Sequence, residues 1–376
     1  MRRAAKRAFL LVSRALGLFH LSRRLTRDRL RILCYHGFAL DDEAEFFPPL
    51  FVHPARFRER LALLARHGFP VLPLDDALRR LERGDLPDGA TAITIDDGFF
   101  SAYAEAVPAL ETHAFPATIY VTTYYAVKQA PVFRLAVQYM FWRSRAASLP
   151  ASHPWAPEAP ADLTDATARV RAMWHVIEYG EARSSEQERH AISRELAELL
   201  GVDYGAICRR RLFHLMTLDA IRDLATRGFD IQLHTHRHRL PQTTEEGTRR
   251  EIVENREVLE AAVGHSLRHL CYPSSIWTPH QWPWLEALRI RSATTCSPGL
   301  NGPDTHRLAL TRFLDTANVS AIEFEAELYG YLELMRPLRA WVWRLLGLRM
   351  PDDAPVGAAA HVPARPTASP SHPRGG

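Results

Sequence analysis

The chain has 376 residues, of which 47% are hydrophobic and 24% are charged, and this balance excludes a wholly disordered protein. The net charge of +4 is unevenly spread: residues 1–31 hold ten Arg or Lys against one Asp, and residues 335–350 hold four Arg and no acid. The rest of the chain is therefore acidic, which argues against a nucleic-acid-binding protein, whose contact surface is normally basic.

The two basic segments are also apolar. Residues 1–30 interleave arginines with Phe, Leu and Val, and residues 335–350 contain Trp341 and Trp343. Neither segment has the uninterrupted run of about 20 apolar residues that a spanning helix needs, and the first lacks a signal-peptide cleavage pattern. Basic amphipathic helices with aromatic anchors commonly lie in a membrane interface. Peripheral membrane association and packing on the body both remain open for them.

Strand and helix patterns alternate along the first third of the chain. Short apolar runs predict strands, and apolar residues at helical spacing predict helices. In chain order the sequence predicts a strand at 31–36, a helix at 54–67, a strand at 69–72, a helix at 74–83, a strand at 90–95, a helix at 102–112 and a strand at 117–122.

Residues 123–215 break this alternation and predict a helical insertion over the mouth of the sheet. The pattern then resumes with a helix at 217–228 whose N-cap is Thr217. Further elements are predicted as a strand at 230–233, a helix at 244–263, a strand at 267–272, a helix at 281–288, strands at 292–296 and 308–313, and a helix at 321–334. Residues 351–376 are rich in Pro, Ala, Ser and Gly and are predicted to be disordered.

About seven strands alternating with helices predict an α/β fold with a parallel sheet covered by helices. In a closed barrel of this kind, the chemistry lies in loops at the carboxyl ends of the strands. The polar clusters of this sequence fall at such ends.

The first cluster is Asp96-Asp97-Gly98, which follows the apolar strand at 90–95. Two adjacent carboxylates at a strand end can divide their roles, one binding a cation and the other accepting a proton from water. A helix N-terminus, where aspartate satisfies free N–H groups, is the alternative for an isolated Asp-Asp-Gly.

The second cluster contains His234 and His238, directly after the strand at 230–233. Two imidazoles and one carboxylate form a common catalytic zinc set that leaves a position open for water. We therefore expect Asp97, His234 and His238 to bind a divalent cation, with Zn²⁺ as the first choice and Co²⁺, Ni²⁺ or Mn²⁺ as alternatives. The cation would lower the pKa of bound water to about 7, and Asp96 would act as general base.

A third loop, Cys271-Tyr272-Pro273-Ser274-Ser275, follows the strand at 267–272. The backbone N–H of Ser274 is a candidate donor to a developing oxyanion. An X-Pro-Ser turn is common in proteins, so this signal is weak by itself.

Together these motifs resemble the polysaccharide deacetylase family. Asp96 and Asp97 match the base and metal positions of the family's first motif, and His234, Thr235 and His238 match its second motif. Tyr35-His36 and Pro116-Ala117-Thr118 also resemble family sequence. The resemblance spans residues 31–334 and implies a distorted (β/α)7-type barrel that hydrolyses the N-acetyl groups of a glycan.

The third motif departs from the family pattern. Cys271 occupies the usual arginine position and Ser275 the usual glycine position. We expect Arg268 or Arg312 to replace the missing arginine, and we favour Arg312 because it ends a predicted strand. The family's late Leu-x-His segment, which supplies a general acid, has no match.

Two alternatives stay open from the sequence. One is a C–N hydrolase of a small amide or ureide on the same fold, and the other is a non-catalytic, membrane-associated scaffold in polysaccharide assembly. Because no signal peptide is recognised and the terminal segments are basic, the expected location is cytoplasmic, at the inner membrane surface.

Overall fold

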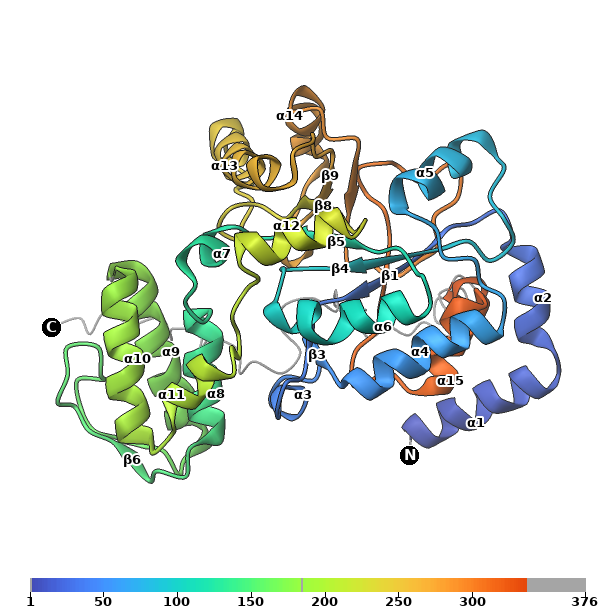
Figure 1. The fold of residues 1–376 in the computed structure, drawn as a ribbon. Coiled ribbons are helices and arrows are strands. Elements are labelled where there is room, and N and C mark those ends of the chain that lie inside the picture. The colour runs from blue at the N-terminus through green and yellow to red at the C-terminus, as the bar shows by residue number, and fades with distance from the viewer. Residues whose placement is uncertain (1, 184, 337–376) are drawn as a thin grey trace, which may run out of the picture. The chain divides into compact units, whose positions relative to one another are not determined.

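The computed structural model describes residues 2–183 and 185–336 (Figure 1). These residues form two compact units, one of residues 2–129 with 214–336 and one of residues 130–213. All of the predicted tail at 351–376 and most of the predicted basic helix at 335–350 lie outside the described residues.

The larger unit is built on a curled sheet of seven strands in the order β10-β9-β8-β5-β4-β1-β11. All neighbouring strands in it are parallel. The predicted α/β class and (β/α)7-type barrel are thereby confirmed. The strands are β1 (Arg31–Tyr35), β4 (Thr91–Ile95), β5 (Thr118–Val121), β8 (Asp230–Leu233), β9 (His269–Cys271), β10 (Ser292–Thr294) and β11 (Phe313–Leu314).

One segment closes the ring between the two edges of this sheet. Leu310 pairs with Thr294 of β10, while Phe313 pairs with Leu33 of β1. Between these two points, the backbone N–H of Arg312 donates to the carbonyl of Ser297 at 2.9 Å. The segment that closes the barrel therefore places the side chain of Arg312 inside it.

Helices surround the sheet in the larger unit (Figure 1). The threonines Thr217 and Thr244 cap α12 and α13 by accepting the N–H groups of Ala220 and Gly247. The helices are α1 (Arg2–Ala15), α2 (Leu18–Leu25), α3 (Glu43–Phe46), α4 (Pro54–Arg66), α5 (Leu74–Arg83), α6 (Val107–Thr112), α7 (Tyr124–Lys128), α12 (Leu218–Thr226), α13 (Glu245–Val263), α14 (Trp282–Ala287) and α15 (Ala321–Leu328). A π-helical turn, Ala102–Ala106, leads into α6, and the unit also holds a small sheet of β2 (Gly37–Phe38) and β3 (Phe51–Val52).

The predicted strand at 69–72 is wrong. Only Val71 forms a bridge, with Thr91 at the start of β4. Pro70 and Pro73 flank it, and proline cannot donate an N–H to a ladder, so pairing cannot extend along the segment. The predicted strand at 308–313 is likewise reduced to the bridge at Leu310 and the two-residue β11.

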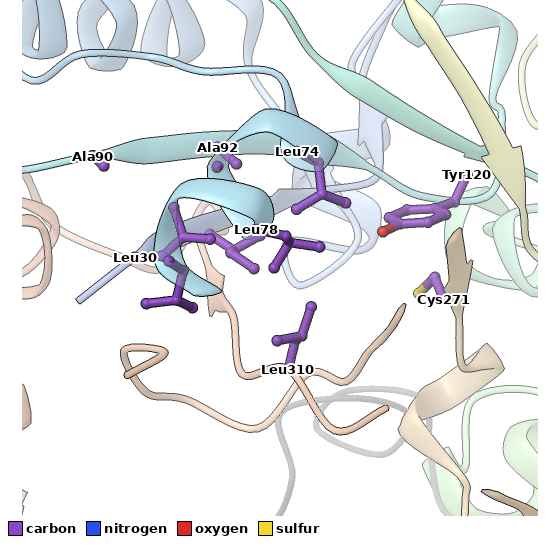
Figure 2. Close-up of a cluster of buried hydrophobic side chains, with 11 residues drawn as sticks. Leu30, Leu74, Leu78, Ala90, Ala92, Tyr120, Cys271 and Leu310 are labelled. Atoms are coloured by element: carbon purple, nitrogen blue, oxygen red, sulfur yellow. The ribbon is translucent and has the colours of Figure 1, made fainter. Parts of the chain in front are cut away.

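An apolar cluster fills the barrel interior near the amino ends of β1 and β4. Figure 2 shows Leu74 and Leu78 of α5 directed at side chains that come from several strands and strand ends. Because side chains alternate along a strand, every second residue faces the barrel interior, and the residues between them face the helices. The cluster comprises Leu30, Ile32, Leu74, Ala77, Leu78, Leu81, Ala90, Ala92, Tyr120, Cys271 and Leu310.

The smaller unit is helical. Its helix α10 begins with a reciprocal capping box between Ser185 and Glu188 and ends at Gly201, whose φ of 65° is the left-handed conformation that glycine favours. The unit begins at residue 130, after α7, whereas the insertion was predicted from residue 123. Its elements are α8 (Phe133–Arg143), α9 (Ala166–Arg183), α10 (Glu186–Leu200), α11 (Tyr204–Arg209) and the pair β6 (Ser148–Leu149) and β7 (Ala161–Asp162).

The helices α1 and α2 pack by one face on the larger unit, with α1 alongside α15 (Figure 1). Lys6 pairs with Glu323, and Arg14 pairs with Glu325. Phe19 of α2 packs on Tyr331 with ring centroids 5.1 Å apart. The basic N-terminal segment is thus folded onto the barrel.

Arg31 holds α2, β1 and α15 together without a carboxylate. Its Nε donates to the carbonyl of Leu328 at 2.6 Å, and its Nη atoms donate to the carbonyls of Arg29 and Thr26 and to the Thr26 hydroxyl. Burial lowers the pKa of Arg31 to about 10. The Leu328 carbonyl, the Arg29 carbonyl and the Thr26 hydroxyl receive hydrogen bonds from this guanidinium, whereas the Thr26 carbonyl also accepts the N–H of Arg29.

We expect Arg31→Met to lower the free energy of unfolding by about 2–4 kcal/mol, because it leaves several buried acceptors unsatisfied. Urea unfolding of the full chain measures this change. Arg66→Met is the matched control, since Arg66 is exposed on α4, and its effect should stay within about 0.5 kcal/mol. Equal urea midpoints for the two variants would refute the role given to Arg31.

Candidate active site

Asp96 and Asp97 end β4 and converge on one region. Asp96 continues the inward alternation of Ala92 and Thr94, so its carboxylate lies inside the barrel. Asp97 has a φ of 69°, a left-handed conformation that is unusual for aspartate and that breaks the alternation. As a result, both carboxylates lie within 4.8 Å of a ligand atom of His234.

Asp97, His234 and His238 form a three-residue cluster. The Oδ1 atom of Asp97 lies 3.2 Å from the Nε2 atom of each histidine. The ligand atoms of a tetrahedral ion with bonds of about 2.1 Å are about 3.4 Å apart, so these spacings suit such an ion. The structure brings together the three residues predicted to bind a metal.

The hydrogen bonding of His234 also suits a metal ligand. Its Nδ1 donates to the carbonyl of Cys271 at 2.9 Å, which leaves Nε2 directed at Asp97. A neutral imidazole of this tautomer presents a lone pair, and not a proton, to the Asp97 oxygen. A cation between the two groups would satisfy both of them.

Two buried polar residues of α13 hold the histidine loop. Asn255 accepts the backbone N–H of His234 at 3.0 Å and donates to the carbonyl of Val121. Glu251 accepts the backbone N–H of Arg237 and the Nε of Arg239. Neither residue was identified from the sequence, although their spacing with Thr248 forms a polar stripe on one helix face.

Arg312 binds the carboxylate of Asp96 at both oxygens. Its Nη1 and Nη2 atoms each lie 2.7 Å from one of them, and both side chains are at most 1% exposed. Burial alone would raise the pKa of Asp96, but the Arg312 guanidinium outweighs it and holds that pKa well below its usual value. Asp96 therefore remains ionised despite complete burial.

Arg312 thus binds Asp96 from a segment outside the third motif. Cys271, which stands at that motif position in the sequence, donates its thiol to Asp96 at 3.2 Å and lies 3.1 Å from Nη2 of Arg312. Arg268, the other candidate from the sequence, donates its backbone N–H to Gln232, and its side chain makes no hydrogen bond with Asp96 in the described part of the chain.

Three of the four cysteines surround the Asp96–Arg312 pair. Cys34, Cys271 and Cys296 are buried and unbridged, although they are scattered in the sequence. Cys34 and Cys296 could in principle share an ion with Asp96. The guanidinium of Arg312 already neutralises that carboxylate, so a second cation is disfavoured there and the Asp97 group is the better site.

Ser274 lies in the loop after β9 with a left-handed φ of 53°. Among the described residues, its backbone N–H donates to no acceptor, and no hydrogen bond joins it to the other five predicted site residues. The loop is fixed instead by Ser275, whose hydroxyl accepts the N–H of Cys296 at 2.9 Å.

His36 is a site residue that the sequence indicated only through Tyr35-His36. It follows β1, and its Nε2 lies 3.7 Å from Oδ2 of Asp96. His306, in contrast, stacks on Trp282 with ring centroids 3.8 Å apart, at the end of a row of stacked rings that includes Trp277 and Tyr272. These rings cover one another's faces within the row.

The cluster is open to solvent on one side. The His238 side chain is 41% exposed, whereas Asp96 and His234 are buried. A ligand can therefore approach the Asp97 group from outside while the second carboxylate remains inside the barrel.

Known proteins match this chain in fold and in family. A family model described as polysaccharide deacetylase matches residues 83–292, while no curated protein sequence matches the chain. The deacetylase PplD of Streptococcus pyogenes, solved in complex with acetate, is 17% identical, covers 80% of this chain and 98% of its own, and has a TM-score of 0.53.

Two further solved structures are similar. IcaB from Ammonifex degensii is 16% identical over 80% of this chain and 97% of its own, with a TM-score of 0.51. A de-N-acetylase from Aggregatibacter actinomycetemcomitans is 13% identical over 80% and 99%, with a TM-score of 0.50. At such identities these likenesses show the fold. Because the family match covers more than half of the chain and includes both the Asp96-Asp97 and the His234–His238 motifs, the chain belongs to the polysaccharide deacetylase family.

Proposed function

We propose that this deacetylase is a metal-dependent hydrolase that removes N-acetyl groups from a sugar, oligosaccharide or polysaccharide precursor. The observation that carries the proposal is the meeting of one Asp97 oxygen and two imidazole nitrogens beside a second, ionised carboxylate. Zn²⁺ is the cation that two histidines and one aspartate fit best. A non-catalytic scaffold would not need Asp96 to stay charged inside the barrel.

Asp97, His234 and His238 would hold the ion, which when bound acidifies water and polarises the acetyl carbonyl. Asp96 then accepts the proton of the attacking water. Arg312 keeps Asp96 ionised and fixes the plane of its carboxylate through two hydrogen bonds. Asp96 can take up a proton only while it is ionised, so Arg312 is a positioning residue for the base.

His36 is the residue best placed to protonate the leaving amine. It lies beside Asp96 and is partly open to solvent, as a proton donor near substrate must be. The free N–H of Ser274 is a candidate donor to the acetyl oxygen as negative charge develops on it.

The substrate proposed from these contacts is an N-acetylated glycan. One of the similar solved structures is itself named a de-N-acetylase. The exposed His238 side chain leaves the Asp97 cluster accessible from solvent.

The metal requirement and the role of Asp96 as base can be tested separately. Chelation should abolish acetate release from N-acetylglucosamine oligomers, and added Zn²⁺ or Co²⁺ should restore it. His238→Ala should lose both bound metal and activity, because it removes one of three ligands. Asp96→Asn should keep the metal but lose about 10²–10⁴-fold in kcat, because it removes only the base.

His265→Ala is the matched control for these variants, since His265 is exposed and distant in sequence from both motifs. It should keep metal content and rate. Acetate release that is indifferent to chelator, with metal absent by elemental analysis, would contradict the proposal.

The pH profile tests Arg312. In the native protein the Asp96 pKa is lowered, so the base is ionised across the neutral range and loses its charge only at strongly acidic pH. In Arg312→Met the guanidinium is gone and burial remains, so the Asp96 pKa should rise. The acid limb of kcat/KM should then move to higher pH, and kcat at neutral pH should fall about tenfold or more.

Arg312→Lys provides the comparison for this experiment. It retains the charge but loses the two-point geometry, so its acid limb should lie between those of the native protein and Arg312→Met. An acid limb that does not move in Arg312→Met would show that Asp96 is not the titrating base.

We expect His36→Gln to lower acetate release from glycan substrates by about 10²-fold, because the leaving amine would lack its donor. Acetanilides with electron-withdrawing rings have amines that leave with less help, so the loss should be smaller on them. His265→Gln should lower neither rate. Equal losses on both substrates would assign His36 to positioning and contradict a donor role.

A further inference from the structure

The helices α1 and α2 expose an unusual share of the protein's large apolar side chains. Of the nine large hydrophobic residues that are strongly exposed among the described residues, five lie on these two helices and a sixth, Leu16, lies in the turn between them. Leu16 is 70% exposed and Leu25 is 61% exposed. This N-terminal apolar patch consists of Phe9, Leu11, Val12, Leu16, Leu21 and Leu25.

The patch residues are spaced so that they form one apolar face, and this face is exposed. Phe9 and Val12 follow one another at helical spacing on α1, Leu16 continues this spacing in the turn after the helix, and Ala5, Ala8 and Ala15 complete the exposed face. Leu21 and Leu25 form the same kind of stripe on α2.

The opposite face of α1 meets the protein through Leu10 and Ser13, with Lys6 and Arg14 paired to Glu323 and Glu325. A surface helix normally buries its apolar face and exposes its charges. In α1 the paired charges lie on the side that meets the protein, although about half of each side chain is exposed, and the apolar side chains face outward.

Unpaired cations lie beside the patch. Arg7, Arg24 and Arg27 are exposed, and none of their side chains makes an ion pair or hydrogen bond with another residue in the described part of the chain. Lys6, Arg14 and Arg23, on the same helices, all have acidic partners. The surface thus combines exposed hydrocarbon with free positive charge.

We propose that this face of α1 and α2 docks on an anionic lipid surface. Helices with an apolar face and flanking arginines lie in the plane of the bilayer interface, with their apolar side chains among the acyl chains. Anionic headgroups would neutralise the three free arginines. A second copy of the chain placed on the same patch would bring like charges together, which disfavours that occupant.

No helix in residues 2–183 or 185–336 meets the length and hydropathy of a membrane-spanning segment. The proposal concerns binding to the surface of a bilayer. The left-handed Gly17, with a φ of 74°, separates α1 from α2 and lets the two helices take different directions on that surface.

Docking is separate from the chemistry. The chain passes from α2 into the amino end of β1, whereas Asp96, Asp97, His234 and His36 follow the carboxyl ends of their strands. Loss of docking should therefore leave the hydrolysis of a soluble substrate unchanged.

The test is co-sedimentation of the full chain with phosphatidylcholine vesicles that contain or lack phosphatidylglycerol. The native protein should bind the anionic vesicles at least tenfold more tightly, and added salt should weaken that binding. The combined variant Val12→Gln, Leu16→Gln should lose at least tenfold in partition. Each arginine near such a surface contributes about fivefold, so Arg7→Gln, Arg24→Gln, Arg27→Gln together should lose on the order of 100-fold.

Matched controls come from elsewhere on the surface. Val127→Gln with Trp142→Gln removes two other exposed hydrophobic side chains, and Arg66→Gln, Arg171→Gln, Arg194→Gln together remove three other exposed arginines. Both controls should bind as the native protein does. All variants should release acetate from soluble oligomers at the native rate, so a docking failure is distinguishable from a catalytic one.

Three outcomes would overturn the proposal. The first is equal binding to neutral and anionic vesicles. The second is undiminished binding by the Val12→Gln, Leu16→Gln variant. The third is a lipid-free dimer, seen by sedimentation velocity, that dissociates in that variant while vesicles bind neither protein, which would assign the patch to a second copy of the chain.

Discussion

The buried ion pair between Arg312 and Asp96 is the interaction on which the rest of the site depends. A carboxylate that is 1% exposed would normally protonate, since its charge has lost the solvation of water. Two hydrogen bonds of 2.7 Å from one guanidinium compensate for this loss and fix the carboxylate in a single plane. The thiols of Cys34 and Cys271 contribute weaker donors to the same oxygen. The Asp96 carboxylate thus keeps its charge, although burial by itself would favour its protonation.

This arrangement gives the two adjacent aspartates different environments. Asp96 is neutralised by an arginine, whereas Asp97 faces two imidazoles that bind a cation only in their neutral form. Because its lowered pKa makes Asp96 a weak base by itself, an ion held by Asp97 and the two histidines would assist by making the attacking water more acidic. The left-handed turn at Asp97 produces this difference, because it directs neighbouring residues toward different partners.

The sequence was sufficient for the strand-end motifs and for the alternation of strands and helices. The apolar runs before Asp96 and His234 are fully buried strands, and such runs are the strongest local signal. The strand at 69–72 failed because two prolines limit its pairing. The gathering of three thiols around the Asp96–Arg312 pair depends on the pairing of β1 with β11, segments that lie far apart in the sequence, and no local pattern records it. Asn255 was missed because its role is visible only once α13 lies against the histidine loop.

The position of Arg312 on the closing segment has a consequence for how the enzyme would fail. This segment joins the two edges of the sheet through short ladders, one at Leu310 and one at Phe313 and Leu314. Partial separation there would withdraw the guanidinium from Asp96 while the other strands remained paired. Substitutions that weaken this closing segment, even far from the substrate, would then allow Asp96 to be protonated. Turnover would be lost before the protein lost its secondary structure.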